Sequence, residues 1–129
     1  MLVLDTNVLI YASVEDSEFH EESLKLLNEK DSAIPQIVVY EYVRVIAELT
    51  RDPLFVLVKI RELAEYNILC EPPHVVQRGL ELWAKHSASI RELNDHVILA
   101  LALTLNAEIA TYDRKLRKLA EELGVPTRP

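Results

Sequence analysis

Four acidic side chains spread along the 129-residue chain are candidates for a single site: Asp5, Glu41, Asp95 and Asp113. Two carboxylates ~4 Å apart repel each other by ~4 kcal/mol at an effective dielectric constant of ~20. Four of them in one pocket therefore need either bound protons or a cation. Hard divalent ions prefer oxygen ligands and are commonly held by a few carboxylates. Because the set contains neither His nor Cys, it predicts a site for Mg²⁺ or Mn²⁺.

The first of these acids closes an apolar run. Leu2-Val3-Leu4 is continuously apolar, as expected for a strand that is covered on both faces, and Asp5-Thr6-Asn7 follows it directly. Open α/β sheets bind their ligands at the carboxyl ends of their strands. The same position suits a purely structural role, because Asp, Thr and Asn commonly bond a turn and cap the following helix. Both interpretations of Asp5 are open at this point.

Each of the other three acids has a structural alternative of its own. Asp95 stands where an apolar helix opens and Asp113 directly precedes another helix, so either could be only a helix N-cap. Glu41 lies in the first turns of a helix, where exposure to solvent is the ordinary state of a Glu. No one of these residues identifies a site, and the metal hypothesis depends on all four together.

Alternating strand and helix patterns predict an α/β fold. The strand candidates are residues 2–4, 33–35, 67–70 and 108–111, with a short edge strand at 125–126. The helix candidates lie between them, at residues 17–27, 36–50, 54–66, 74–86, 97–105 and 114–123, while residues 87–92 are expected to form a loop. This alternation implies a parallel sheet of four to five strands with helices on both faces. In such a sheet the four acids can meet at one edge.

Length and composition predict one globular domain over residues 1–129. Half of the residues are hydrophobic and only 2 are Gly, which argues against disorder. The single Cys70 cannot form an intrachain disulfide, which fits a reducing cytoplasm. No uncharged apolar run approaches the roughly 18 residues of a membrane helix, so no membrane association is expected.

The net charge of −7 argues against a nucleic-acid-binding protein, because such proteins usually carry a basic surface. The four candidate acids would account for 4 of those 7 excess charges. Divalent ions bound to them would neutralise these charges before a phosphate approaches. An acidic protein could then still bind a nucleic acid.

Four short motifs run nearly from end to end of the chain: Leu4–Ile10, Val38–Tyr42, Asn94–Ala100 and Ile109–Asp113. In this order and spacing they resemble the PIN-domain ribonucleases, and especially the VapC-like toxins of bacterial and archaeal toxin–antitoxin pairs. The resemblance implies a three-layer α/β/α fold and hydrolysis of RNA phosphodiesters with one or two Mg²⁺ or Mn²⁺ ions. It assigns metal binding and catalysis to Asp5, Glu41, Asp95 and Asp113, which match the acids of the family.

The resemblance also implies supporting residues around these acids. Thr6, Asn7 and Thr111 match polar positions that help to hold the acids or an ordered water in the family. The chain departs from the family after its last aspartate, where many members carry a further acid and an aromatic residue. Lys115 and Leu116 occupy those places, so a fifth acidic ligand is not expected there.

Three partners follow from the same resemblance. They are an RNA substrate, a small antitoxin protein across the active-site groove, and a second copy of the chain. Local basic residues such as Arg91 and Arg114 are candidates for RNA contact, and simple exposure to solvent is the alternative for each. The apolar helix at Leu54–Tyr66 is the candidate homodimer face.

Two other functions explain less of the sequence. A catalytically inactive PIN-like interaction module would leave four mutually repelling acids without a purpose. A small-molecule phosphohydrolase with an aspartyl nucleophile would want a second acid at the position of Asn7.

Overall fold

A computed structural model describes residues 1–86 and 89–129, and a five-stranded parallel sheet lies at its centre. The strands are β1 (Leu2–Leu4), β2 (Ser32–Pro35), β3 (Ile68–Leu69), β4 (Glu108–Ala110) and β5 (Thr127–Arg128). Their order is β3-β2-β1-β4-β5, and every neighbouring pair is parallel. The predicted α/β fold with a parallel sheet of four to five strands is confirmed.

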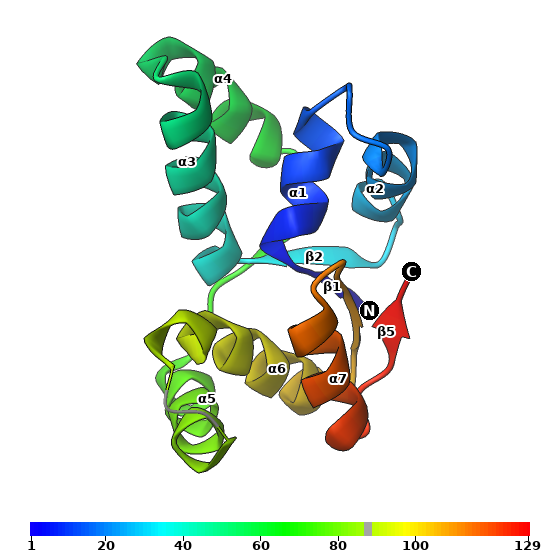
Figure 1. The fold of residues 1–129 in the computed structure, drawn as a ribbon, viewed down its shortest axis with the longest axis vertical. Coiled ribbons are helices and arrows are strands. Elements are labelled where there is room, and N and C mark those ends of the chain that lie inside the picture. The colour runs from blue at the N-terminus through cyan, green and yellow to red at the C-terminus, as the bar shows by residue number, and fades with distance from the viewer. Residues whose placement is uncertain (87–88) are drawn as a thin grey trace.

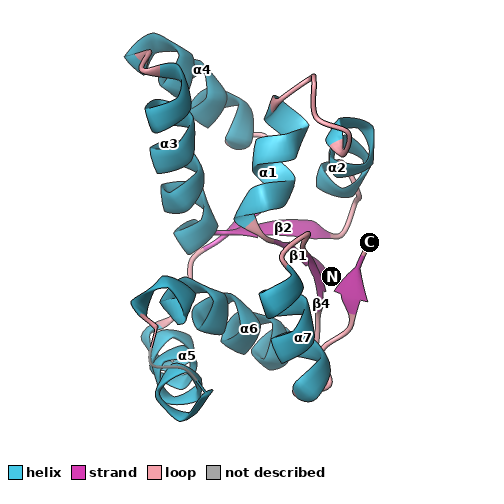
Figure 2. Cartoon of the chain, viewed as in Figure 1, coloured by secondary structure: helices cyan, strands magenta, loops and turns pink. Residues whose placement is uncertain are grey.

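Helices cover both faces of this sheet. They are α1 (Thr6–Ser13), α2 (His20–Leu27), α3 (Gln36–Thr50), α4 (Pro53–Leu63), α5 (Pro73–His86), α6 (Leu93–Leu105) and α7 (Arg114–Glu122). Helices α1 to α4 lie on one side of the sheet and α5 to α7 on the other, which gives the three layers (Figures 1 and 2). None of the described helices is both long enough and apolar enough to cross a membrane.

The last strand lies two residues later than the sequence predicts. Val125 is buried in the core, and its N–H donates to the carbonyl of Ala120 at 2.8 Å, so it closes the end of α7 instead of entering the sheet. The carbonyl of Pro126 accepts from Ile109 N at 2.9 Å, and pairing with β4 continues at Thr127 and Arg128. The predicted position of the edge strand, Val125-Pro126, is therefore wrong, whereas the prediction that a short edge strand follows α7 is confirmed.

The predicted loop at residues 87–92 is only partly described. Residues 87 and 88 lie outside the described part of the chain, and Ile90–Glu92 forms a single 3₁₀ turn, η1, ahead of α6. This turn matters for the site, because it sets where α6 begins.

Two helices show how the core is built. Helix α6 buries every residue from His96 to Ala102, which is the pattern of a helix enclosed on all sides. Helix α3 instead buries one stripe, Val38, Tyr42 and Ile46. Leu49, which the sequence pattern places inside, is 65% exposed, because the far end of α3 extends beyond the sheet toward α4 (Figure 1).

Helices α5 and α6 approach each other closely at Gly79. A Cβ at this position would lie 2.7 Å from Val97 Cα and 3.0 Å from Val97 N, and backbone atoms cannot rotate away. We expect Gly79→Ala to lower the free energy of unfolding by about 1–3 kcal/mol, since overpacking forces the helices apart. Urea denaturation of the variant beside the wild-type protein measures the change.

Gly124→Ala is the comparison for that experiment. Gly124 has a φ of 73°, and a Cβ at this position would meet no atom within 4 Å, so its substitution strains the backbone without a clash. A Gly79→Ala protein as stable as the wild type would show that α5 can shift on α6 without cost.

Candidate metal centre

The four acids converge on the carboxyl ends of the two central strands. Asp5 directly follows β1 and begins α1, whereas Asp113 follows β4 and begins α7. These two helices leave the sheet toward opposite faces (Figure 1). Between them lies the point where the order of the strands reverses, and open α/β sheets bind their ligands at such a point.

Asp5 is the most enclosed of the four acids, with 5% of its surface exposed. Its Oδ1 accepts from the backbone N–H of Thr6 at 2.8 Å, which is the cap of α1. Its Oδ2 accepts from Thr111 Oγ1 at 2.7 Å and from Asn7 Nδ2 at 3.1 Å. Asp5 therefore caps a helix with one oxygen and holds a polar network with the other, so the two interpretations of this residue are compatible.

Burial raises the pKa of Asp5 to about 6, although its hydrogen bonds with Thr111 and Thr6 oppose the rise. The negative charges of Glu41 and Asp113 raise it further. Removal from water costs a carboxylate more than these hydrogen bonds return. A cation beside Asp5 would relieve this cost.

Glu41 projects from α3 and is held by two other elements. Its Oε2 accepts a short hydrogen bond from Thr6 Oγ1, and its Oε1 accepts another from Asn94 Nδ2. Thr6 thus joins Glu41 to the start of α1, and its supporting role stays a prediction. Asn94 was not predicted as a site residue, and its position next to Asp95 in the first turn of α6 is the signal that could have identified it.

Asp95 is the third residue of α6, and the N-cap of that helix is Glu92. The alternative that Asp95 is only a helix cap is therefore wrong, because the helix begins before it. Burial raises the pKa of Asp95 to about 8, and the charges of Asp5 and Asp113 add to the effect. No described residue donates a hydrogen bond to this carboxylate, so nothing compensates for its ionisation.

Asp113 caps α7, because its Oδ1 accepts from Lys115 N at 2.8 Å and Leu116 N at 3.4 Å. Its own N–H donates to Thr111 Oγ1 at 3.0 Å. The hydroxyl of Thr111 thus donates to Asp5 and accepts from Asp113, and so ties the ends of β1 and β4 together. Asn7 adds a second tie, since its Oδ1 accepts from Tyr112 N at 3.2 Å.

The donor set fits a hard divalent ion, but it is not a finished chelate. Among the described residues, no three His, Cys, Asp or Glu side chains are arranged so that they could hold an ion directly. Both carboxylate oxygens of Glu41 accept hydrogen bonds, from Thr6 and Asn94, and Asp113 Oδ1 caps α7. Mg²⁺ keeps several of its waters, so carboxylates that sense one another's charge without touching can hold it through those waters.

A fifth acid does lie near this group, though not where the family pattern puts it. Glu92, at the end of η1, raises the pKa of Asp95, and its Oε1 is 3.9 Å from Lys115 Nζ. Such an exposed, long ion pair contributes little to stability. Arg91 in η1 and Arg114 at the start of α7 are exposed beside the acids, and their contact with substrate stays a prediction.

Four acids gathered at the carboxyl edge of a parallel sheet, between helices on its two faces, are the features that define the class of this protein. The model of the PIN domain family matches residues 2–122. The chain therefore belongs to the PIN domain family. Comparison with curated proteins gives no match.

Several solved structures share the fold. VapC20 of Mycobacterium tuberculosis, described as a sarcin-ricin loop cleaving toxin, is 11% identical with a TM-score of 0.77, covering 92% of this chain and 95% of its own. VapBC2 of Rickettsia felis, bound to a promoter DNA fragment, is 20% identical with a TM-score of 0.72 and coverages of 98% and 96%. VapBC-1 of nontypeable Haemophilus influenzae is 20% identical with a TM-score of 0.69 and the same coverages. The recognised fold is thus that of VapC toxins.

Proposed function

We propose that this protein is a metal-dependent endoribonuclease and the toxin of a toxin–antitoxin pair. The observation that carries the proposal is the pair Asp5 and Asp95 in a PIN domain. Asp5 is buried and Asp95 is partly buried, and both carboxyls have raised pKa values. The negative charge of these two carboxylates is costly in the protein alone. A divalent cation that also binds a phosphate would offset this cost. Mg²⁺ or Mn²⁺, as one or two ions, is the cofactor that these oxygen ligands favour.

Each acid has a role in this mechanism. Asp5, Asp95 and Asp113 would hold the ion directly or through water, and Thr111 and Asn7 fix the orientation of Asp5. When bound, the ion supplies Lewis-acid polarisation of the scissile phosphate and lowers the pKa of a bound water. Glu41, which Thr6 and Asn94 position, would orient the attacking water and accept its proton at a carboxylate oxygen, while solvent would protonate the leaving oxygen as its bond to phosphorus breaks.

Charge and composition bear on how the protein contacts RNA and on its cellular compartment. The net charge of −7 and the exposed Arg91 and Arg114 favour contacts limited to the neighbourhood of the site, with modest nonspecific affinity. The single, exposed Cys70 suits a reducing compartment, and we place the protein in the cytoplasm.

An apolar surface on α3 and α4 supports protein partners. Leu54 is 74% exposed, and Leu49, Leu57 and Val58 are also exposed around it. Monomeric proteins rarely leave a large contiguous apolar patch open. We propose that this surface forms a homodimer. It belongs to the predicted helix Leu54–Tyr66 and to the end of α3. We also propose that a small antitoxin covers the four acids. A monomer mass in light scattering at micromolar concentration would refute the homodimer.

A catalytically inactive interaction module is the second candidate. The observation that favours it is that the described acids do not form a ready chelate. A protein that binds a divalent ion must gain thermal stability when the ion is added, because the ion binds only the native state. An unchanged melting temperature with Mn²⁺ would support the module and count against the nuclease.

Cleavage of labelled single-stranded and structured RNAs by the purified protein tests the proposed function. We expect products with Mg²⁺ or Mn²⁺ and none with EDTA. Absence of cleavage together with absence of metal-induced stabilisation would overturn the proposal.

Thr111→Val is expected to lower cleavage by roughly 10–100-fold, the usual loss when a group that orients a metal ligand is removed. The variant keeps the shape of the side chain but loses the hydroxyl that donates to Asp5 and accepts from Asp113. Rates under single-turnover conditions measure the loss. Thr104→Val is the matched control and should cleave like the wild type. It removes a hydroxyl on α6 that donates to the carbonyl of Ala100 and accepts from Arg78 Nη1 at 3.4 Å, away from the acids.

A further inference from the structure

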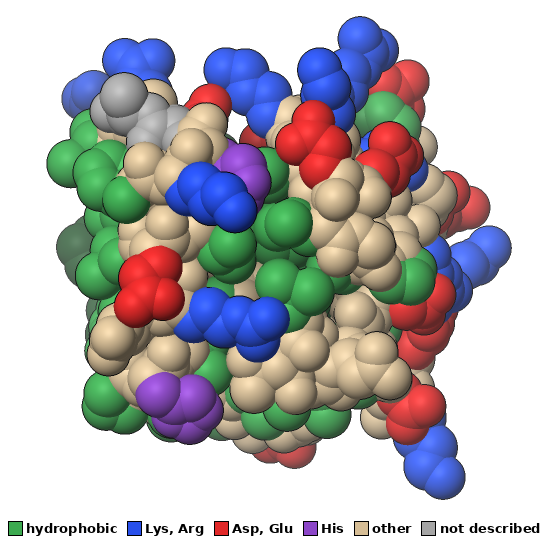
Figure 3. Space-filling view, turned by 90° about the horizontal axis from the view of Figure 1, so that it is seen from below, with side chains coloured by type: hydrophobic (Ala, Val, Ile, Leu, Met, Phe, Trp, Pro, Cys, Tyr) green, Lys and Arg blue, Asp and Glu red, His purple; other side chains and the backbone are tan. Residues whose placement is uncertain are grey.

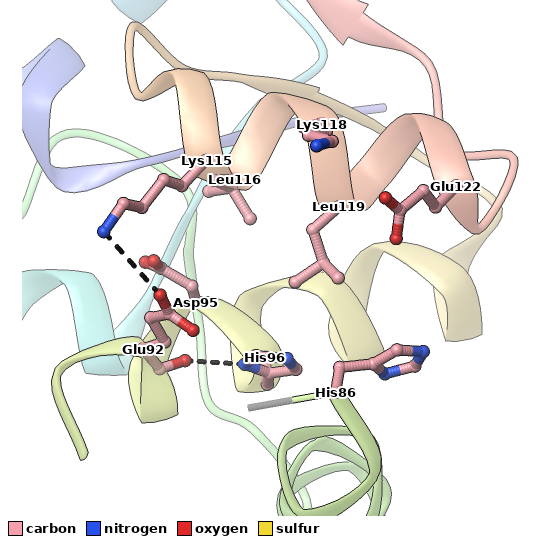
Figure 4. A pocket seen from close by; sticks show the side chains of 9 residues that line it. All are labelled: His86, Glu92, Asp95, His96, Lys115, Leu116, Lys118, Leu119 and Glu122. Carbon is pink, nitrogen blue, oxygen red and sulfur yellow. Dashed lines mark hydrogen bonds and ion pairs between the residues drawn. The ribbon is translucent and has the colours of Figure 1, made fainter. Parts of the chain in front are cut away.

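A pocket of about 310 Å³ adjoins the metal centre on the side of α5 and α7. Asp95 stands at one end of it, and the pocket continues past His96 to His86, with Lys115, Leu116 and Leu119 along α7 (Figure 4). We call this the histidine pocket. On the face that α5 to α7 form, a hollow with hydrophobic side chains at its base lies among separate Lys, Arg and His side chains (Figure 3).

His96 carries an unused polar atom in the wall of the histidine pocket. Only 1% of this residue is exposed, and its Nδ1 is 2.7 Å from the carbonyl oxygen of Glu92. A carbonyl only accepts, so Nδ1 carries the proton and Nε2 of the neutral ring is an acceptor. No described residue donates to Nε2, although buried polar atoms are normally paired. Figure 4 shows that the ring lies between Glu92 and His86, with its Nε2 edge turned away from Glu92.

The surroundings of His96 match the surfaces of a flat, partly polar ligand. The rings of His86 and His96 are nearly parallel, at 20°, with centroids 6.2 Å apart, and aromatic faces of this kind stack on bases. Leu116 and Leu119 add an apolar wall, and the exposed Lys115 and Lys118 stand at the rim, where a phosphate would meet them. A nucleobase with its phosphate presents these same surfaces.

We propose that the histidine pocket is a nucleobase subsite for the RNA strand beside the scissile phosphate, with His96 Nε2 accepting a hydrogen bond from an N–H of the base. The proposal rests on the proposed function, because it assigns sequence preference to the same site. Nε2 is screened from solvent, so the base reaches it when a wall side chain rotates, and we assign this movement to His86 at the exposed end of α5.

Binding of non-cleavable RNA tests the subsite. The probes are labelled 2′-O-methyl pentanucleotides of A, C, G or U, added to the protein with Mg²⁺. We expect the wild type to bind its preferred base roughly three- to tenfold more tightly than the worst, the effect of one net hydrogen bond. His96→Asn keeps an N–H donor near the Nδ1 position but lacks Nε2, so it should bind all four alike. His96→Gln, whose amide reaches the Nε2 position, should restore part of the preference.

His20→Asn is the matched control. His20 Nδ1 also lies within hydrogen-bond distance of a carbonyl, that of Tyr11 at 2.9 Å, but the residue lies outside the pocket. It should keep the wild-type preference. Equal affinity of the wild type for all four probes, or an unchanged preference in a folded His96→Asn protein, would overturn the subsite. Cleavage of unmodified RNA and melting curves with Mn²⁺ separate the two proposals. A preference that depends on His96, without cleavage and without metal-induced stabilisation, refutes the nuclease alone. Cleavage with no such preference refutes the subsite alone.

Discussion

Asp5→Asn is expected to reduce RNA cleavage by more than about 100-fold. This loss exceeds the one expected when a group that only orients a metal ligand is removed. The substitution keeps the size of the side chain but replaces a carboxylate oxygen with an amide and removes the negative charge. Asn can still cap α1 through its remaining oxygen, as Asp5 does through Oδ1. The fold should therefore survive while metal binding is lost.

The matched control is Asp52→Asn. Asp52 also caps a helix, since its Oδ1 accepts from Leu54 N at 3.1 Å and Phe55 N at 3.3 Å, but it stands at the start of α4 and takes no part in the acidic cluster. It should cleave RNA at the wild-type rate. Equal losses of cleavage rate in the two variants, or an unfolded Asp5→Asn protein, would mean that Asp5 stabilises the helix and takes no part in catalysis.

Asp95→Asn is expected to stabilise the protein when no divalent ion is present, by at least about 1 kcal/mol near pH 8. The folded protein holds the Asp95 proton until the pKa of about 8, whereas an unfolded Asp releases it near its ordinary pKa of 3.8. Between these values the native state binds more protons than the unfolded state. The free energy of unfolding therefore falls as the pH rises from about 4 to about 8. Asn has no proton to release, so the variant escapes this loss.

Melting curves at about pH 5 and about pH 8, with EDTA or with Mn²⁺, measure both parts of this prediction. The wild type should lose stability at the higher pH and regain it with Mn²⁺, while Asp95→Asn should respond less to either change. Asp31→Asn, at an exposed position beside β2, is the control and should follow the wild type. A wild-type melting temperature that is independent of pH and of Mn²⁺ would contradict the assignment of Asp95 to a cation site.

The sequence predicted the strand ends well because local pattern determines them. Leu2-Val3-Leu4 is apolar on both faces and stops at Asp5, and all three of its residues are buried. The placement of Asp113 before α7 follows in the same way from a strand, a polar turn and a helix start. These signals are contained within a few consecutive residues.

What the sequence did not predict depends on contacts between distant segments. Asn94 acquires its place at the site only because α6 and α3 meet, 53 positions apart, at Glu41. Glu92 became a neighbour of Asp95 because η1 extends the start of α6. Leu49 is exposed because α3 extends beyond the sheet. Helical periodicity alone does not show where the surface that a helix packs against ends.

The enclosure of α6 on all sides has a consequence for hydrogen exchange. Amides of a helix whose residues from His96 to Ala102 are all buried open only in large, costly fluctuations, whereas those at the far, exposed end of α3 open in small ones. Asp95 is thus attached to a slowly exchanging part of the molecule, and Glu41 to a helix that is anchored along one stripe. Glu41 lies between the buried Val38 and Tyr42 near the start of α3, so opening of the far end of this helix would leave the acidic cluster in place.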